Sequence, residues 1–389
     1  MNILVITATY PPSANGVAVS TKRTVTALRK LGHRVVVYGP KRSGIPEEQD
    51  YIAAPTIRIP LLGISDYPIA IPHPVAVLCA LLPDIRWDII HVHHPVIAGP
   101  FAVRMGKKLG VPVVFTYHTR YDQYIEHFLG APLYFRRWLY RWLYEGGLVS
   151  IIRSFDGVIA TTRWLKTMLT KTIPGLRVYY ASTAGLTKSF FVRRSKQTLR
   201  RTLGLSEAEP VFLSVSRLSK EKRTDILLRG FLHWADTHDQ GILVMVGDGG
   251  NRSYLESLSR ASVHHARVRF VGKILNDDLP QWYSCADIFL YSSITDTIGI
   301  NILEAMSAGL PVVAPDHLTT REIIVPGANG QLYKGNESGM AKAIDTALRY
   351  RNRLARGAFH TAKGYDVMIT IRQLLGIYET LIRQYKRHT

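Results

Sequence analysis

The chain has 389 residues, more than one hydrophobic core usually organises and a length that suits two α/β domains. Its hydrophobic content of 47% is that of a folded globular protein and excludes wholesale disorder. The net charge of +20, from 49 Lys and Arg against 29 Asp and Glu, favours a polyanionic or phosphorylated partner without distinguishing nucleic acid from anionic lipid.

The first half alternates apolar runs with amphipathic stretches. It opens with NILVITA (2–8), a continuous apolar run typical of a buried parallel strand, followed by a loop rich in Pro, Asn and Gly. A helix is predicted over TKRTVTALRKLGH, closed by Gly32. Further strands are predicted at 35–39, 88–95, 111–119, 157–162 and 177–181, and further helices at 96–109, near 132–145 and at 163–171. This alternation predicts a parallel sheet with helices on both faces.

The second half repeats the pattern after a polar, basic separating stretch at 193–210. Strands are predicted at 210–218, 242–249, 267–274, 287–293 and 311–315, with helices at 224–235 and 299–308. The fold class is therefore α/β, with two Rossmann-like parallel-sheet domains and a ligand-binding cleft between them. We expect an N-terminal domain at 1–192, a C-terminal domain at 193–365, and a long amphipathic helix at 366–389 that packs back on the first domain.

Cysteine usage and hydropathy indicate the compartment. Cys79 and Cys285 lie far apart in apolar surroundings, which predicts two small buried side chains in a reducing cytosol. The N-terminus lacks the features of a signal peptide. The most apolar stretch, 67–83, is broken by prolines and is shorter than the roughly 20 residues of a spanning helix. We expect a cytoplasmic protein with peripheral contacts on the inner face of the membrane.

Loops at strand ends of the second half carry groups suited to a diphosphate. Arg217 and Lys222 follow a predicted strand in SRLSKEKR. Together they can hold a diphosphate, the Arg217 guanidinium through paired hydrogen bonds and the Lys222 ammonium as a compact positive charge. A solvated charge run is the alternative for this pair taken alone. The glycine-rich turn VGDGGNR lacks the context of a dinucleotide-binding loop.

The segment TDTIGINILEAMSAGLPVV predicts an anion site at a helix start. Backbone N–H groups of Gly299, Ile300 and Asn301 are expected to point out of the helix that begins near Gly299. Asp296 and Glu304 flank this turn and can hold sugar or ribose hydroxyls on either side of a phosphate. For Glu304, a solvated helix face is the alternative.

The first half offers a glycine and several histidines near strand ends. Gly16 permits close backbone approach to a phosphate or sugar, with a simple turn glycine as the alternative. His118 ends a predicted strand, and a structural histidine is the alternative to a catalytic one. His91, His93 and His94 look like metal ligands, but no Cys or acid accompanies them nearby, so no metal is predicted.

Together these motifs resemble the family 4 retaining glycosyltransferases, whose GT-B fold has two Rossmann-like domains facing across a cleft. The resemblance covers nearly the whole chain. It rests on the order and spacing of NGVAVSTKRTVTALRKLGHRV, VSRLSKEKRTDILLRGF, FVGKILNDDL and ADIFLYSSITDTIGINILEAMSAGLPVVAPD. Each motif is weak alone, and their combination leaves few competitors.

The resemblance implies a nucleotide-sugar as co-substrate, with neither a metal nor another cofactor. Asp296 stands where the family usually has Glu, the first acid of an E-x7-E pair that contacts the donor sugar. The catalytic residues implied are His118, beside the transferred sugar, with Arg217, Lys222 and Asp296. The donor-binding residues implied are Gly16, Arg217, Lys222, Ile274 (base), Asp296, Gly299, Ile300, Asn301 and Glu304 (ribose).

Within the family, TYHTRYDQYIEHF together with NGVA is most similar to enzymes that glycosylate diacylglycerol or related lipids. A basic amphipathic helix, YFRRWLYRWLYEGG, would suit the anionic membrane surface that such an acceptor implies, and an ordinary core helix is the alternative. The stretch 61–83 is a second candidate for lipid contact. The acceptor or membrane residues are Tyr121, Arg136, Arg137, Trp138, Arg141 and Trp142.

The implied reaction is retaining transfer of a hexose, glucose from UDP-glucose for example, to a membrane lipid such as diacylglycerol. The nearest alternative is a non-lipid acceptor such as polysaccharide, or a phosphatidylinositol-type acceptor with GDP-mannose. A phosphorylase or epimerase could share the fold. A nucleic-acid-binding protein would explain the charge but not the strand-end loops. The oligomeric state stays open.

Overall fold

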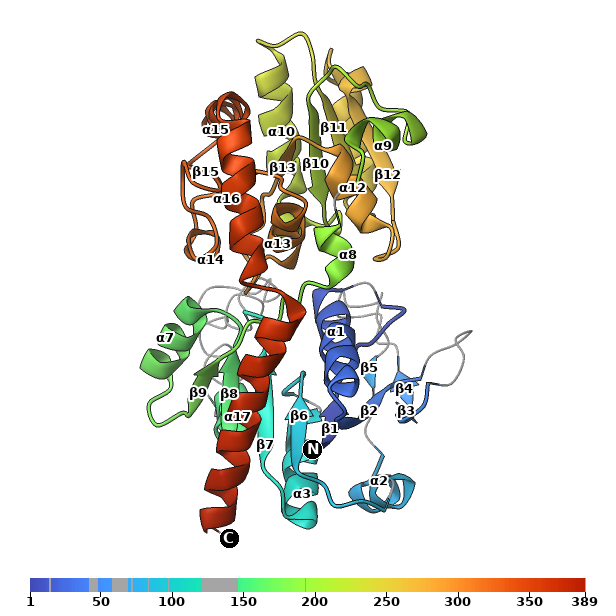
Figure 1. The fold of residues 1–389 in the computed structure, drawn as a ribbon, viewed down its shortest axis with the longest axis vertical. Helices are drawn as coiled ribbons and strands as arrows, with labels where there is room; N and C mark the ends of the chain where they lie inside the picture. Colours follow the sequence, from blue (N-terminus) through green and yellow to red (C-terminus); the bar gives the residue numbers. More distant parts are fainter. Residues whose placement is uncertain are drawn as a thin grey trace. The chain divides into compact units, whose positions relative to one another are not determined.

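The computed structural model describes the chain except residues 14, 42–47, 58–68, 71–72, 83, 97, 121–145, 193 and 389. It divides into two compact units (Figure 1). Unit 1 is Met1–Gly185 with Val367–Thr389, and unit 2 is Leu186–Asp366. Each unit is built on a parallel sheet, so the predicted fold class of two parallel-sheet α/β domains is confirmed.

Unit 1 has a seven-stranded sheet in the order β3-β2-β1-β6-β7-β8-β9, with every neighbouring pair parallel. The strand order reverses between β1 and β6. Such a switch point is where open α/β sheets bind ligands. The strands are β1 (Asn2–Ile6), β2 (Arg34–Pro40), β3 (Tyr51–Ala54), β6 (Ile89–Val92), β7 (Val113–Tyr117), β8 (Gly157–Ala160) and β9 (Val178–Tyr180), and β4 (Thr56–Ile57) pairs with β5 (Ile69–Ala70) in a small antiparallel sheet.

Helices cover both faces of this sheet because its strands are apolar on both sides. Ile3 and Val5 share a core with α1 (Gly16–Lys30) and α17 (Val367–His388), which lie side by side (Figure 1). Leu4 and Ile6 belong to the core of the opposite face. The helices that contribute to that second core are α2 (Val75–Leu81), α3 (Ala98–Leu109), α6 (Val149–Arg153) and α7 (Arg163–Thr172).

Unit 2 has a six-stranded parallel sheet in the order β12-β11-β10-β13-β14-β15. Its switch point lies between β10 and β13. The strands are β10 (Val211–Val215), β11 (Ile242–Val246), β12 (Val268–Gly272), β13 (Ile288–Leu290), β14 (Val312–Pro315) and β15 (Gly330–Tyr333). The helices are α8 (Lys188–Phe191), α9 (Lys196–Thr202), η3 (Lys220–Lys222), α10 (Thr224–Ala235), α11 (Arg252–Arg260), η4 (His265–Arg267), α12 (Leu279–Cys285), α13 (Ile300–Ser307), α14 (Leu318–Arg321), α15 (Glu337–Arg349) and α16 (Arg351–Lys363).

The polar stretch 193–210 is more than a separator. It contains α9, whose Arg200 is buried and donates hydrogen bonds to the Cys285 carbonyl at 2.9 Å and to the Asp287 carboxylate. The chain passes into unit 2 before residue 192, because α8 packs on α13 and the Ser307 hydroxyl donates to the Phe190 carbonyl at 3.2 Å. In sequence, a basic helix whose cations form buried ion pairs cannot be distinguished from a solvated linker.

The described residues also bear on the thiols and on membrane crossing. Cys285 is buried and Cys79 is half-buried, and both are free thiols. Burial raises the pKa of Cys285 to about 11. No helix within the described ranges is both long and apolar enough to cross a bilayer. The helix predicted near 132–145 lies outside the described residues.

Candidate active site

The switch point of unit 2 brings Lys222 and Asp296 together. Lys222 ends the short helix after β10, and Asp296 lies in the loop after β13, so the parallel strands carry both to one edge. The Lys222 ammonium forms an ion pair with Asp296 Oδ1, and the Tyr291 hydroxyl donates to Oδ2 at 2.5 Å. Two residues predicted to act on a donor are therefore in contact, and Tyr291 joins them.

This environment keeps Asp296 ionised. Burial alone would raise the pKa of Asp296, but the Lys222 charge and hydrogen bonds from Lys222, Tyr291 and Ser293 outweigh burial and lower it. Burial and the neighbouring carboxylate raise the pKa of Tyr291 well above its ordinary value, so the phenol stays a donor. The cluster thus holds a fixed lysine cation at the switch point.

Arg217 forms a second charged pair on the same segment. Its guanidinium donates to Glu221 Oε1, which also accepts from the Ser219 hydroxyl at 2.7 Å. Burial opposes ionisation of Glu221, but the Ser219 hydrogen bond and the Arg217 charge lower its pKa. The Ser292 hydroxyl donates to the Lys222 carbonyl at 2.7 Å, which ties this segment to the end of β13.

The glycine-rich turn after β11 supports the loop that carries Arg217. A Cβ on Gly247 would lie 1.9 Å from the Ser216 carbonyl oxygen, and Gly247 has a φ of +135°. Leu218 donates its N–H to the Asp248 carbonyl at 2.9 Å. The turn therefore packs backbone to backbone against the β10 loop, which accounts for its glycines without a dinucleotide.

The start of α13 is less open than predicted. The Ile300 N–H already donates to the Ile298 carbonyl at 3.0 Å, so the prediction that it points out of the helix was wrong. A tight turn before the helix uses that donor. A side chain at Gly299 would require the Ile302 side chain to move, because a Cβ there would lie 2.7 Å from Ile302 Cδ1. The Asn301 side chain donates to the Val215 carbonyl at 2.7 Å and fixes the helix against β10.

Glu304 lies on α13, and Ile274 lies beyond the end of β12. Glu304 is only 4% exposed, so the alternative of a solvated helix face is excluded. Its carboxylate accepts a 2.9 Å hydrogen bond from the Tyr283 hydroxyl of α12. Ile274 lies in the loop after β12, at the edge of the sheet where Gly272 accepts the Gly247 N–H at 2.8 Å.

Unit 1 places histidines at the corresponding edge. His93 and His94 follow β6, and His118 follows β7. His93 Nδ1 and His118 Nε2 are 2.8 Å apart, while His94 Nδ1 accepts the Ala8 N–H at 3.0 Å. Gly16 is the first residue of α1, on the loop after β1.

Burial keeps these histidines neutral. It lowers the pKa of His91 to about 3 and that of His94 to about 4. Burial and neighbouring histidine charges lower the pKa values of His93 and His118 well below the ordinary range. Over the described part of the chain, no group of three or more His, Cys, Asp or Glu side chains is arranged to bind a metal. That the reaction needs no metal stays a prediction.

The predicted acceptor or membrane residues cannot be placed. All of them lie in 121–145, outside the described residues: Tyr121, Arg136, Arg137, Trp138, Arg141 and Trp142.

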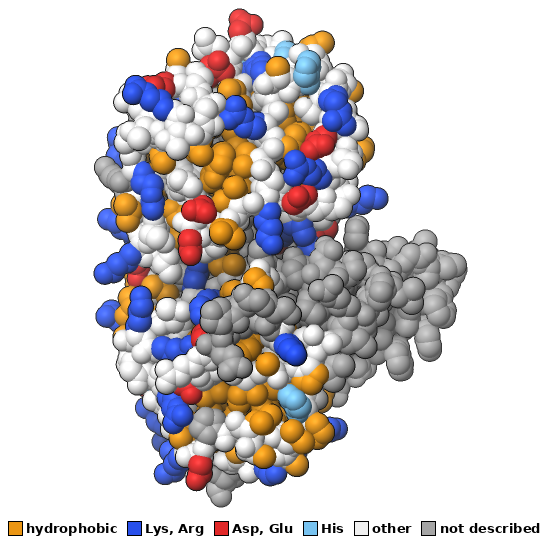
Figure 2. All heavy atoms as spheres, turned by 90° about the vertical axis from the view of Figure 1, so that its right-hand side faces the viewer, with side chains coloured by type: hydrophobic (Ala, Val, Ile, Leu, Met, Phe, Trp, Pro, Cys, Tyr) orange, Lys and Arg blue, Asp and Glu red, His pale blue; other side chains and the backbone are white. Residues whose placement is uncertain are grey.

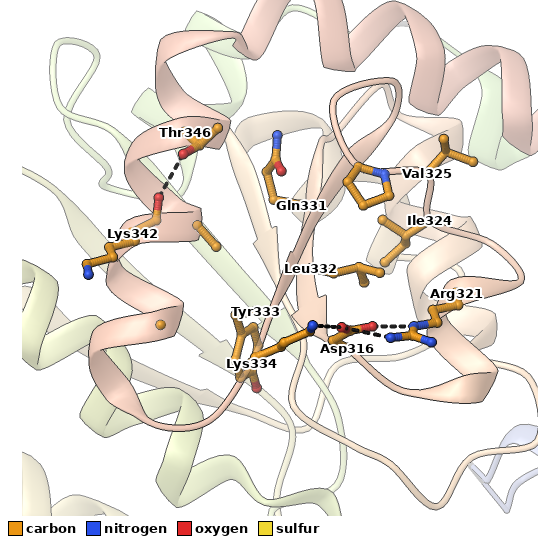
Figure 3. A pocket seen from close by; sticks show the side chains of 13 residues that line it. Asp316, Arg321, Ile324, Val325, Gln331, Leu332, Tyr333, Lys334, Lys342 and Thr346 are labelled. Atoms are coloured by element: carbon orange, nitrogen blue, oxygen red, sulfur yellow. Dashed lines mark hydrogen bonds and ion pairs between the residues drawn. The ribbon is translucent and has the colours of Figure 1, made fainter.

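A hollow of about 770 Å³ lies elsewhere in unit 2, against β15 and α15 (Figure 3). Its lining includes Arg321 and Lys334, which both pair with Asp316. β15 is the outermost strand of the sheet, whereas the charged cluster lies at β10 and β13. We therefore assign the site by its chemistry at the switch point rather than by the size of this hollow.

The basic charge is dispersed on the face shown in Figure 2. There, Lys and Arg side chains are interspersed with acidic, polar and apolar groups among the coloured residues. A duplex-binding surface would be expected to show a continuous basic stripe. That nucleic acid is not a partner stays a prediction.

Comparison with known proteins identifies the family to which the chain is similar. The chain matches the model of Glycosyltransferase Family 4 over residues 14–180 and that of Glycosyl transferases group 1 over residues 195–360. It is 28% identical to an alpha-monoglucosyldiacylglycerol synthase of Streptococcus pneumoniae over 357 residues, 90% of this chain and 78% of that protein. It is 25% identical to a GDP-mannose-dependent alpha-mannosyltransferase of Mycolicibacterium smegmatis, with 98% of both proteins covered.

A solved structure shares the fold. HepE of Anabaena, crystallised with UDP-glucose, superposes with a TM-score of 0.73 at 20% identity, covering 98% of this chain and 100% of that one. One family model matches most of unit 1 and the other matches most of unit 2. The chain therefore belongs to family 4 of the glycosyltransferases, has the GT-B fold, and is a hexosyltransferase.

Proposed function

We propose that this enzyme transfers a hexose, glucose in the first instance, from a UDP-sugar to a membrane lipid such as diacylglycerol, with retention of configuration. The observation that carries the donor half of the proposal is the Lys222–Asp296–Tyr291 cluster, with Arg217 beside it, at the β10/β13 switch point. This is the edge where open parallel sheets bind nucleotides.

The proposed chemistry needs positive charge at the leaving group. When the bond between the sugar C1 and the diphosphate breaks, the departing oxygen gains negative charge. The acceptor hydroxyl forms the new bond on the same face of the sugar, and its proton passes to the departing oxygen. Arg217 and Lys222 would stabilise that charge, an effect worth about 2.7–4 kcal/mol per preorganised donor. The buried Glu304 carboxylate is the proposed partner of the ribose hydroxyls.

The choice of donor and acceptor rests on relatives. The pneumococcal relative is an alpha-monoglucosyldiacylglycerol synthase, and HepE was crystallised with UDP-glucose. The mycobacterial relative is GDP-mannose-dependent, so GDP-mannose is the second candidate donor. A screen of UDP- and GDP-sugars against diacylglycerol in mixed micelles, with mass detection of product, separates the two. Transfer only from GDP-mannose, or only to a soluble glycan, would overturn the proposal.

Helix α2 supports contact with a membrane. It contains no charged residue, and Val77 and Leu81 are 44% and 49% exposed. It packs on α3, where Cys79 Sγ lies 3.7 Å from Met105 Sδ, and α3 also carries the exposed side chains of Arg104, Lys107 and Lys108. An exposed apolar helix next to cations suits an anionic bilayer surface.

Vesicle sedimentation tests this contact. We expect Leu81→Asp to weaken sedimentation with vesicles containing anionic lipid, because the aspartate would have to enter the apolar boundary. Val263 is 87% exposed in unit 2, so Val263→Asp is the matched control and should sediment like the wild type. If both variants sediment equally, α2 does not contact the membrane.

Steady-state kinetics tests the phosphate assignment. We expect Arg217→Ala and Lys222→Ala each to lower kcat/KM by about a hundredfold, because each removes a cation from the leaving group. Lys220 lies on the same short helix and is exposed, so Lys220→Ala is the control. If Arg217→Ala keeps kcat/KM within about twofold of the wild type, the assignment is wrong.

A further inference from the structure

Several polar side chains of unit 1 share one face of its sheet. His91 on β6 and His93 just beyond it point to the same side, since side chains alternate along a strand. Thr116 and His118 follow the same alternation on β7 and its end. The His91 and His93 rings lie 4.3 Å apart between centroids, and the His93 and His118 rings are stacked at 5.0 Å.

The His93 ring is buried beside His118. Its side chain is 2% exposed, and its Nδ1 lies 2.8 Å from His118 Nε2. Its other ring nitrogen, Nε2, is buried and has no hydrogen-bond partner among the residues that the structure describes. Among the described residues, the His93 side chain therefore makes one hydrogen bond, to His118.

That asymmetry fixes the position of the proton. Burial lowers the pKa values of His93 and His118 well below neutral pH, so each ring carries one proton, and only one of the two facing nitrogens can donate. With its proton on Nε2, His93 would bury an N–H group without an acceptor. With its proton on Nδ1, it donates to His118 and leaves only an acceptor unused. Orphaned buried N–H groups are the rarer of the two in proteins.

We propose that His93 is a positioning residue that donates its Nδ1–H to His118 Nε2 and so holds His118 as the Nδ1–H tautomer. The Nε2 lone pair of His118 is then occupied. In that tautomer the one ring proton of His118 is on Nδ1, so toward a sugar or acceptor oxygen His118 is a hydrogen-bond donor rather than a base. The inference rests on the proposed function only in placing His118 beside the transferred sugar.

His91 holds the His93 ring in place. Its Nδ1 lies 2.5 Å from the Tyr378 hydroxyl of α17, and its Nε2 lies 2.6 Å from Thr116 Oγ1. Both of its nitrogens are therefore engaged, and its ring lies against that of His93 in a tilted arrangement. The C-terminal helix thus contributes to the orientation of a residue at the candidate site.

Nitrogen NMR of the full-length, histidine-labelled protein reads the tautomers directly. Long-range ¹H–¹⁵N correlations distinguish protonated from unprotonated ring nitrogens, and loss of a signal in His118→Gln assigns that ring. We expect both His93 and His118 to be protonated at Nδ1 near neutral pH. His118 protonated at Nε2, or divided equally between tautomers, overturns the proposal. Because this measurement uses the wild type, it does not depend on the folding of a variant.

Two variants at position 93 test the consequence for activity. The amide nitrogen of Asn can occupy the place of His Nδ1, whereas that of Gln falls near Nε2. We expect His93→Asn to keep a kcat about tenfold higher than that of His93→Gln, as for other residues that orient a histidine. We also expect the His118 Nδ1–H signal to persist in His93→Asn and to be lost in His93→Gln. Equal kcat and equal spectra for the two variants would contradict a positioning role.

The two hypotheses fail separately. If the wild type transfers no sugar from any donor but shows the Nδ1–H tautomer of His118, the proposed function is wrong and the hydrogen-bond assignment stands. If transfer occurs while His118 is protonated at Nε2, the function stands and the positioning role is wrong.

Discussion

The two units place different chemistry at the same edge of the same kind of sheet. At the β10/β13 switch point of unit 2, Lys222 and Arg217 are fixed as cations by Asp296 and Glu221. At the corresponding edge of unit 1, burial keeps the histidines neutral, and His93 and His118 share a hydrogen bond. One fold thus supports a charged edge suited to a diphosphate and a neutral edge suited to hydroxyl groups.

The difference extends below the edge. In unit 2, the 3% exposed Asp287 accepts hydrogen bonds from Lys196 at 2.5 Å, from Arg200, from Arg351 at 2.6 Å and from the Val211 N–H at 2.8 Å. In unit 1, β1 and β2 are buried between two apolar cores. Unit 2 therefore depends on ionic contacts for its stability as well as for its proposed function.

The largest effect expected from this comparison is on stability. Asp287→Ala would leave the buried Arg200 guanidinium without its carboxylate, so we expect the free energy of unfolding to fall by about 3–5 kcal/mol. Urea unfolding measures the change. Arg201 lies on the same helix and forms an exposed pair with Glu207, so Arg201→Ala is the control and should leave the midpoint unchanged. A similarly small change in the free energy of unfolding for both variants would show that unit 2 does not depend on the Asp287 ion pairs for its stability.

A smaller effect is expected at the edge itself. Tyr291→Phe removes the hydrogen bond to Asp296, and bonds to a charged group are worth about 1.5–3 kcal/mol. We expect that loss in urea unfolding, together with a rise in the pKa of Asp296. The Tyr254 side chain is 48% exposed and its hydroxyl accepts a hydrogen bond from Arg229 at the surface, so Tyr254→Phe should leave the free energy of unfolding unchanged. If Tyr291→Phe also leaves the free energy of unfolding unchanged, the Tyr291 hydroxyl does not stabilise the Asp296 carboxylate.

A pH dependence of stability is expected to separate the units. His91 and His94 have pKa values of about 3 and about 4 in the folded protein, below the unfolded value of roughly 6.5. The unfolded chain therefore binds more protons, and stability falls as pH drops from 6.5 towards 4, by up to about 1.4 kcal/mol per pH unit for each histidine. The lowered pKa values of Asp287 and Asp296 act in the same direction but at lower pH. Their contribution to stability is complete above the unfolded value and is lost only as the pH falls below about 4.

Hydrogen exchange can follow this separation. With intrinsic rates corrected for pH, we expect peptides from β6 and β7 to lose protection between pH 6.5 and 4.5, before peptides from β10 and β13. Simultaneous loss in both units, or earlier loss in unit 2, would contradict the assignment of neutral histidines to unit 1 and paired acids to unit 2.

The sequence predicted the buried strands well because each has an apolar pattern of its own. NILVITA gave β1, and the helix predicted at 224–235 coincides with α10. The edge strand β15 and the polar helices α9 and α16 were missed, because short edge strands and helices with one narrow apolar stripe differ little from loops in composition. The role of Arg200 could not be predicted, since its partner Asp287 is distant in sequence.

The site was predicted in part. Lys222 and Asp296 were both predicted as residues of the donor site from their places at strand ends, and the structure brings them into contact. Tyr291 could have been found by the same rule, because it directly follows β13. The hydrogen bond that uses the Ile300 N–H depends on the geometry of a local turn, and no residue type at that position signals it.

Titration calorimetry with UDP tests the central claim, that the Lys222 cluster holds the diphosphate of a nucleotide, most directly. We predict that UDP binds the wild type and Lys220→Ala alike and that Lys222→Ala binds at least about tenfold more weakly, as expected for the loss of one charge-assisted contact. Failure of UDP, GDP and ADP to bind the wild type, or UDP binding to Lys222→Ala that equals that of the wild type, would contradict the claim.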